Sequence, residues 1–130
     1  MRFLEIAKHL SIPVKVVTDN DGDVLALEKK YENYIGSNKK DNIEICYDDT
    51  VHTGILTLGK DEKPFNYNTL EPLLLSENDL KTFNEIFNTS YLTDDDLHKY
   101  MKTHKTDCAL KIFSYGSSIT YPEYIKRAIQ

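Results

Sequence analysis

The sequence predicts a mixed α/β fold of the Rossmann-like kind, with a short, mainly parallel sheet flanked by helices and a helical C-terminal third. An apolar, β-branched run at 14–18 is followed by a helical pattern and then by an alternating segment at 43–47, which is the order of a right-handed βαβ unit. Beyond residue 76 the apolar residues recur at helical spacing. The 130 residues are enough for a core of their own, so we expect a single domain over 1–130.

The N-terminal elements belong to this βαβ unit. Residues 2–10 predict a short helix that ends before Pro13. Its core-facing side chains are expected to be Phe3, Ile6, Ala7 and Leu10. Apolar residues at helical spacing predict a second helix over 24–35, which Asp23 caps and Gly36 ends. This helix therefore connects the two predicted strands.

The rest of the chain predicts one irregular β region followed by helices. Asp48, Asp49 and Thr50 predict a turn, and residues 51–58 alternate loosely, which favours a peripheral hairpin strand. Residues 65–75 predict an edge strand or an irregular crossing, because Pro72 cannot donate within a central ladder. The signals that start the following helices are Ser76 with Asp79 as a capping box, Thr93 with an acidic first turn, a polar break at 102–107, and Thr120 with Pro122 and Glu123.

Composition and charge exclude several classes of protein. No apolar run is long enough to span a membrane. The net charge is −5, from 21 acidic and 16 basic residues, whereas a general nucleic-acid-binding protein is basic. Any contact with DNA is therefore expected through metal ions, or through a basic surface supplied by another domain or chain. Cys46 and Cys108 are far apart and have no partner motif, so we expect buried, reduced thiols and a cytoplasmic location.

Acidic residues follow the first predicted strand at Asp19, Asp21 and Asp23. Open α/β sheets place their binding residues at this end of a strand. Asp19 and Asp21 are two positions apart, so in extended backbone they point to the same side. Two such carboxylates without a nearby Lys or Arg need a cation between them, and Mg²⁺ takes oxygen ligands of this kind. The alternative interpretation is ordinary turn and helix-capping chemistry, which also uses Asp, Asn and Gly.

Four sequence blocks, in this order, carry a resemblance to a known family. They are Val-Val-Thr-Asp-Asn-Asp-Gly-Asp at 16–23, Ile-Cys-Tyr at 45–47, Asn-Tyr-Asn-Thr-Leu-Glu-Pro at 66–72 and Lys-Thr-Asp-Cys-Ala-Leu-Lys-Ile-Phe at 105–113. Together they resemble the C-terminal Toprim region of OLD-family (overcoming lysogenization defect) ATP-dependent endonucleases, which include the nucleases of Gabija-type phage defence. The resemblance covers most of the chain.

The resemblance implies metal-dependent cleavage of DNA with Mg²⁺ or Mn²⁺. Asp19 and Asp21 match the aspartate pair of the family, and Glu71 matches the acid of its Leu-Glu-Pro block. These three acids are the implied metal ligands. Lys105, with Lys111 as the fallback, matches the lysine that stabilises charge on the phosphate. Asp19, Asp21, Glu71 and Lys105 are thus the implied catalytic residues.

Two features of the family are missing from this sequence. Toprim domains begin with a glutamate-bearing strand, whereas this chain opens in the helix before the Asp-containing strand, and Glu5 does not match that glutamate. A phosphate-binding Gly-x-x-x-x-Gly-Lys-Ser/Thr loop is also missing, so the ATPase half would be a partner in the parent protein. The sequence therefore predicts an N-terminally truncated Toprim domain with little activity alone. The alternatives are a non-catalytic interaction module that forms a homodimer and, with less support, another phosphoryl-transfer enzyme with an aspartyl phosphate at Asp19.

Overall fold

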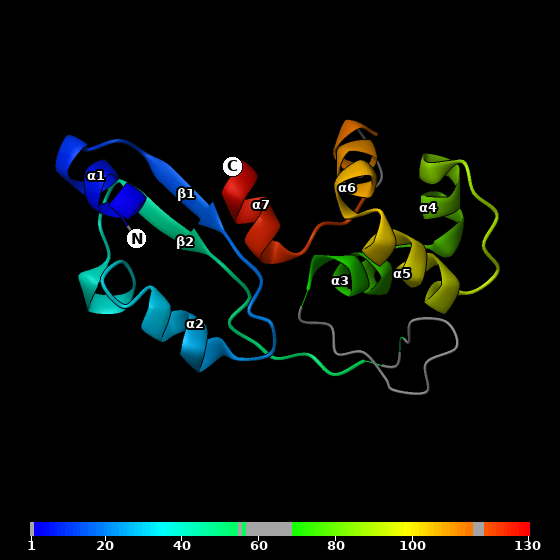
Figure 1. Cartoon of the computed structure of the whole chain (residues 1–130), viewed down its shortest axis with the longest axis horizontal. Coiled ribbons are helices and arrows are strands. Elements are labelled where there is room, and N and C mark those ends of the chain that lie inside the picture. Colours follow the sequence, from blue (N-terminus) through cyan, green and yellow to red (C-terminus); the bar gives the residue numbers. More distant parts are fainter. Residues whose placement is uncertain (1, 55, 57–68, 116–118) are drawn as a thin grey trace. The chain divides into compact units, whose positions relative to one another are not determined.

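The computed structural model describes residues 2–54, 56, 69–115 and 119–130, and these residues divide between two compact units. The first unit comprises Met1–Val51 and Glu123–Gln130, and the second comprises His52–Pro122. In the described part the fold is mixed α/β, with one parallel sheet of two strands and seven α-helices (Figure 1).

The first unit is built on the predicted βαβ arrangement. Strands β1 (Val14–Val17) and β2 (Ile43–Cys46) pair in parallel, with Val14 opposite Ile43 and Val17 opposite Cys46. Helix α2 (Val24–Lys30) connects them in sequence. Helices α1 (Arg2–Leu10) and α7 (Glu123–Ile129) also pack on this pair, and Figure 1 shows α7 beside the strands. The buried core consists of Leu4, Ala7, Leu27, Tyr31, Tyr34, Ile43 and Ile45.

Helix α2 begins as predicted and ends earlier than predicted. The Asp23 carboxylate accepts a hydrogen bond from the Ala26 N–H at 2.9 Å, which confirms the cap. The helix stops at Lys30, because Tyr31 and Tyr34 are buried in the core. The Tyr34 N–H donates to the Tyr31 carbonyl at 2.8 Å, which closes a turn after the helix. Gly36 has a φ of 56° and starts a short 3₁₀ turn instead of ending α2.

The predicted core face of α1 is confirmed at Ala7 and wrong at Phe3, Ile6 and Leu10. Leu4 and Ala7 are the buried residues of this helix. By contrast, the side chains of Phe3, Ile6 and Leu10 are 67%, 54% and 65% exposed. The helix carries apolar residues on two faces, and only the face that contains Leu4 meets the rest of the first unit. The other face is an exposed apolar surface.

The second unit is helical in its described part, as the sequence predicted for the C-terminal third. Its helices are α3 (Leu70–Glu77), α4 (Leu80–Phe87), α5 (Asp94–Thr103) and α6 (Lys105–Ser114). Thr93 caps α5, accepting a hydrogen bond from the Asp96 N–H at 3.2 Å. The buried core consists of Leu56, Leu74, Leu75, Phe83, Phe87, Leu97, Met101, Cys108 and Ile112.

The irregular β region was predicted wrongly where it can be compared. Residues 70–75 lie in α3 instead of an edge strand. Pro72 is tolerated there because it lies in the first turn, where its missing N–H needs no helical partner. Residues 51–54 have no regular structure and Leu56 forms only an isolated bridge. The other residues of the two predicted segments lie outside the described part of the chain.

Two further helix boundaries differ from prediction. The capping box fails because Ser76 lies inside α3, where its hydroxyl donates to the Leu73 carbonyl at 2.7 Å. Asp79 occupies the cap position of α4 without a side-chain hydrogen bond to it. The predicted polar break at 102–107 is much shorter, since only His104 separates α5 from α6.

The cysteines are buried and free, as expected. Over the ranges that the structure describes, the helices are all too short or too polar to cross a membrane.

Asn20 and Asn42 join the segments at opposite ends of the two strands. Asn20 is 3% exposed, and its amide donates to the carbonyls of Asp48 and Thr50 at 2.9 Å each. Its side-chain oxygen accepts from the Gly22 N–H at 2.9 Å. The loop after β1 is thereby fastened to the loop after β2. At the other end, the Asn42 amide donates to the carbonyls of the α1 region, Ala7 at 3.0 Å and Ile12 at 2.9 Å.

Replacing Asn20 by Ala is expected to lower the free energy of unfolding by about 2–4 kcal/mol, because three part-buried hydrogen bonds of a buried side chain are lost. Urea denaturation followed by circular dichroism measures the change. Asn33→Ala, at an exposed position of the same unit, is the matched control. Equal stability of the two variants would show that Asn20 does not fasten the loops.

Candidate functional site

Five aspartates follow the carboxyl ends of the two parallel strands. Asp19, Asp21 and Asp23 follow β1, and Asp48 and Asp49 follow β2. The Thr18 N–H donates to the Cys46 carbonyl at 3.1 Å, which continues the strand pairing up to the start of the first loop. Because Asn20 then fastens one loop to the other, acids from both loops belong to one edge of the sheet. This is the edge at which open α/β sheets place their ligands.

Asp19 is positioned by the C-terminal helix. The Tyr124 hydroxyl of α7 donates to Oδ1 of Asp19 at 2.7 Å. Tyr124 is itself buried, with 2% of its surface exposed, so its ring holds the hydroxyl in place. Asp19 is half-buried. A fixed, partly desolvated carboxylate of this kind suits a hard cation or a buried polar contact.

The backbone at Asp21 is not extended. Asp21 has a φ of 50° and Gly22 has a φ of 83°, so two successive residues are left-handed and turn the chain sharply. Asp19 and Asp21 were expected to point to the same side of an extended backbone, and the backbone at Asp21 is left-handed instead. Asp tolerates the left-handed region better than most residues. Asp21 is exposed, and Asp23 serves as the cap of α2.

The sequence analysis missed the acids after β2, which it interpreted as a turn. Asp48 accepts from the Thr50 N–H at 3.0 Å, and Asp49 accepts from the Thr50 hydroxyl at 3.1 Å. The turn interpretation is therefore correct for these local bonds. Their position after a second parallel strand was the signal that places them at the same edge as Asp19.

The donor chemistry of this edge fits Mg²⁺ or Mn²⁺, because all five candidates offer carboxylate oxygens. The arrangement of these carboxylates is less complete as a metal site. Within the described residues, no group of three or more His, Cys, Asp or Glu side chains is arranged to hold a metal ion. The hydrogen bonds of Asp23, Asp48 and Asp49 account for part of this, since each directs a carboxylate to a local partner.

Glu71 and Lys105 meet in the second unit. Glu71 lies in the first turn of α3 with 14% of its side chain exposed, and Lys105 is the first residue of α6. Their charged groups are 3.9 Å apart. Lys102 is equally close to Glu71 at 3.9 Å and is only 17% exposed. It also donates to the Thr69 hydroxyl at 3.2 Å.

Glu71 is therefore compensated by two ammonium groups. A metal ion at Glu71 would have to displace these lysines or share the carboxylate with them. Sequence reasoning missed Lys102, because it lies on α5 and only the packing of α3 against α5 brings it to Glu71. The fallback residue, Lys111, pairs with Asp107 at 3.0 Å one helical turn away, and this contact raises the pKa of Lys111. Lys105 is thus the more available lysine.

An apolar cavity of about 370 Å³ adjoins this ion pair. Its lining includes Glu71, Lys105, Leu74 and Met101, together with Cys108. Burial raises the pKa of the Cys108 thiol to about 11, so this thiol stays protonated at neutral pH. A protonated thiol is a weak nucleophile and a weak metal ligand. Cys108 is therefore part of the core of this unit and not a reactive group.

The four predicted site residues fall into two pairs. Asp19 and Asp21 share the carboxyl edge of the first unit, and Glu71 and Lys105 share an ion pair in the second. Convergence of Glu71 with the two aspartates stays a prediction, because these residues belong to different units.

No protein-family model, curated protein or solved structure matches this chain. The Toprim interpretation therefore depends on the four sequence blocks and on the features of each unit.

Replacing Glu71 by Gln is expected to destabilise the protein by about 1–3 kcal/mol, because it leaves the half-buried Lys102 without its anion. Thermal and urea denaturation measure this difference. Glu77→Gln, an exposed position at the end of the same helix, is the control and should change stability by less than about 0.5 kcal/mol. Equal stability of the two variants would rule out a structural role for the Glu71 ion pairs.

Proposed function

We propose that this chain is the Toprim-type endonuclease domain of an OLD-family protein, which cleaves DNA with Mg²⁺ or Mn²⁺ in the cytoplasm. The observation that supports the proposal most is the parallel βαβ unit whose carboxyl edge carries Asp19 and Asp21 in loops fastened by Asn20. The ATPase domain of the parent protein would be the partner. The isolated chain is proposed to have little activity.

Each predicted site residue has a chemical role in this proposal. Asp19, held by Tyr124, and Asp21, on its exposed turn, bind the cations. The chemistry that such cations would supply is polarisation of the scissile phosphate and a lower pKa of the attacking water. Lys105 is 61% exposed at the start of α6, where its ammonium group can neutralise charge on the phosphate. Glu71 holds Lys105 in this structure and completes the metal site only if the second unit brings it to the aspartates.

The aspartate pair is tested by metal binding and by nicking of supercoiled DNA. Mn²⁺ at about ten times its dissociation constant should stabilise the wild-type protein by about 1.4 kcal/mol, measured as a rise in melting temperature. Asp19→Asn with Asp21→Asn should abolish this rise and any Mn²⁺-dependent nicking. The control is Asp94→Asn with Asp96→Asn, an exposed aspartate pair of the same spacing.

Two outcomes would contradict the proposal in different ways. If Mn²⁺ stabilises the wild-type protein and the Asp19/Asp21 variant equally, the carboxyl edge is not a metal site. If the isolated chain nicks DNA rapidly and Asp19→Asn abolishes the activity, the site is correct and the claim of low intrinsic activity is wrong.

The exposed apolar face of α1 favours a second candidate function, a non-catalytic module that forms a homodimer. Phe3, Ile6 and Leu10 lie on one side of α1 and are more than half exposed. Ile12, just after the helix, is 45% exposed and extends this apolar surface. Contiguous apolar surface on a protein is typical of interaction sites.

The dimer hypothesis predicts a concentration-dependent dimer in analytical ultracentrifugation, which Ile6→Glu with Leu10→Glu should dissociate by placing charges in the interface. Leu25→Glu is the control, because Leu25 is 78% exposed on α2 and lies outside the α1 surface. A monomer at every concentration would reject this function. Mn²⁺ should leave the melting temperature unchanged if the module has only this role.

A further inference from the structure

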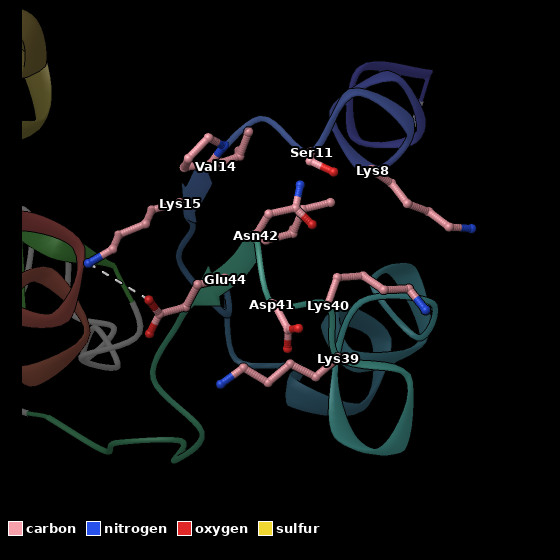
Figure 2. Close-up of a pocket in the computed structure, with 11 residues that line it drawn as sticks. Lys8, Ser11, Val14, Lys15, Lys39, Lys40, Asp41, Asn42 and Glu44 are labelled. Atoms are coloured by element: carbon pink, nitrogen blue, oxygen red, sulfur yellow. Dashed lines mark ion pairs between the residues drawn. The ribbon is translucent and has the colours of Figure 1, made fainter.

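A basic cavity lies at the amino end of the two strands, at the opposite end from the aspartates. It has a volume of about 610 Å³ and belongs entirely to the first unit (Figure 2). Its cations are Lys8 on α1, Lys15 on β1, and Lys39 and Lys40 just before β2. The lining therefore includes four lysines from three segments of the chain, and Figure 2 shows Lys39 extending to the opposite side from Lys8 and Lys40.

The acids of the cavity neutralise only part of this charge. The two carboxylates in the lining are Asp41 and Glu44. Glu44 pairs with Lys15 at 3.8 Å, and the same lysine donates to the Arg127 carbonyl at 2.8 Å. Lys15 is therefore occupied by contacts within the unit. The lining as a whole keeps an excess of two positive charges, in a chain whose net charge is −5.

The other three lysines are more available to a ligand. Lys8 is 3.8 Å from Glu5, but both side chains are more than 40% exposed, so this pair contributes little. Within the described ranges, neither Lys39 nor Lys40 forms an ion pair. Figure 2 shows the side chains of Lys8 and Lys40 extending to the same side of the cavity.

The segments that carry these lysines are fixed to one another. Asn42 lies in the cavity lining and donates to the carbonyls of Ala7 and Ile12, which ties the end of α1 to the start of β2. Its own carbonyl accepts from the Val14 N–H at 2.8 Å. A backbone bridge between Lys40 and Ile43 holds the lysine turn against the strand. The backbone segments that carry the lysines are thus held together by hydrogen bonds.

We propose that this cavity binds the phosphate backbone of nucleic acid through Lys8, Lys39 and Lys40. Lysine ammonium groups bind phosphates as point charges, and such contacts dominate non-specific affinity for nucleic acid. The cavity is much larger than one phosphate ion, and its lining contains no aromatic side chain on which a base could stack. The proposed contact is therefore to the backbone and independent of base sequence. The choice of ligand rests on the proposed function.

This site differs from the contact that the sequence analysis expected. DNA was expected to bind through metal ions or through a basic surface of another domain or chain. The lysine cavity is a basic surface on this chain itself, and its contact with DNA needs no metal. It can therefore be measured separately from cleavage, in the presence of a chelator.

The decisive experiment is fluorescence anisotropy with the full chain, a labelled duplex of about 20 base pairs, about 50 mM KCl and EDTA. Lys39→Gln with Lys40→Gln should weaken binding by at least about fivefold and reduce the slope of log Kd against log [KCl] by about two. The matched control is Lys29→Gln with Lys30→Gln, an exposed lysine pair of α2 that should bind like wild type.

A gain of affinity tests the same site without the risk of unfolding. Asp41 is exposed, so Asp41→Asn should remove a repulsive charge and strengthen binding by about twofold or more, whereas Glu32→Gln, elsewhere on the first unit, should not. The proposal is overturned if wild type does not bind in EDTA, if both lysine pairs act equally, or if pyrophosphate binds while DNA does not. In EDTA, Asp19→Asn with Asp21→Asn should bind DNA as the wild type does, so this measurement tests the lysine cavity independently of the Mn²⁺-dependent nicking that tests the nuclease proposal.

Discussion

The buried amide of Asn20 is the constraint on which the first unit depends. A sheet of two strands of four residues each makes few hydrogen bonds, and an isolated pair of this size is marginal in water. Helices α1, α2 and α7 supply the apolar cover, but the strand ends still need fastening. Asn20 does this at the carboxyl end through two carbonyls of the second loop, and Asn42 does it at the amino end through two carbonyls near α1. Both asparagines therefore hold the strand ends by hydrogen bonds to neighbouring segments.

The two fastened ends of the strands carry opposite charges. Aspartates occupy both loops at the carboxyl end, and lysines line the cavity at the amino end. Like charges gathered on neighbouring loops repel one another, so each end needs a rigid frame to hold its groups together. The hydrogen bonds of Asn20 and Asn42 supply that frame. The chain is acidic as a whole, but a polyanion would meet negative charge at the carboxyl end of the strands and positive charge at the amino end.

Local patterns predicted the parts of the fold that local interactions determine. The parallel strands, the Asp23 cap and the Thr93 cap were all readable from short stretches and are confirmed. The core face of α1 was wrong at Phe3, Ile6 and Leu10, because two faces are apolar and only packing decides which is buried. The segment around Pro72 was wrong, because proline is compatible with an edge strand and with a first helical turn.

The candidate site shows the same limit in its side chains. The position of Asp19 after β1 followed from the strand pattern, but its hydrogen bond to Tyr124 joins residues 105 positions apart and leaves no local signal. The role of Asn20 was hidden for the same reason, since an Asn beside Asp and Gly is typical of any turn. Lys102 was missed because helix packing, and not spacing, brings it to Glu71.

The return of α7 to the first unit has a consequence for how the chain folds. Tyr124 reaches Asp19, Arg127 donates to the Tyr47 carbonyl at 2.7 Å, and Lys15 donates to the Arg127 carbonyl, so α7 closes a unit that the N-terminal residues began. The second unit is inserted between these two parts. During synthesis on the ribosome, the inserted helices emerge whole while the strand pair still lacks its final helix. The acidic edge is thus completed only after the second unit has been synthesised, and a nascent chain short of residue 123 holds Asp19 without its tyrosine.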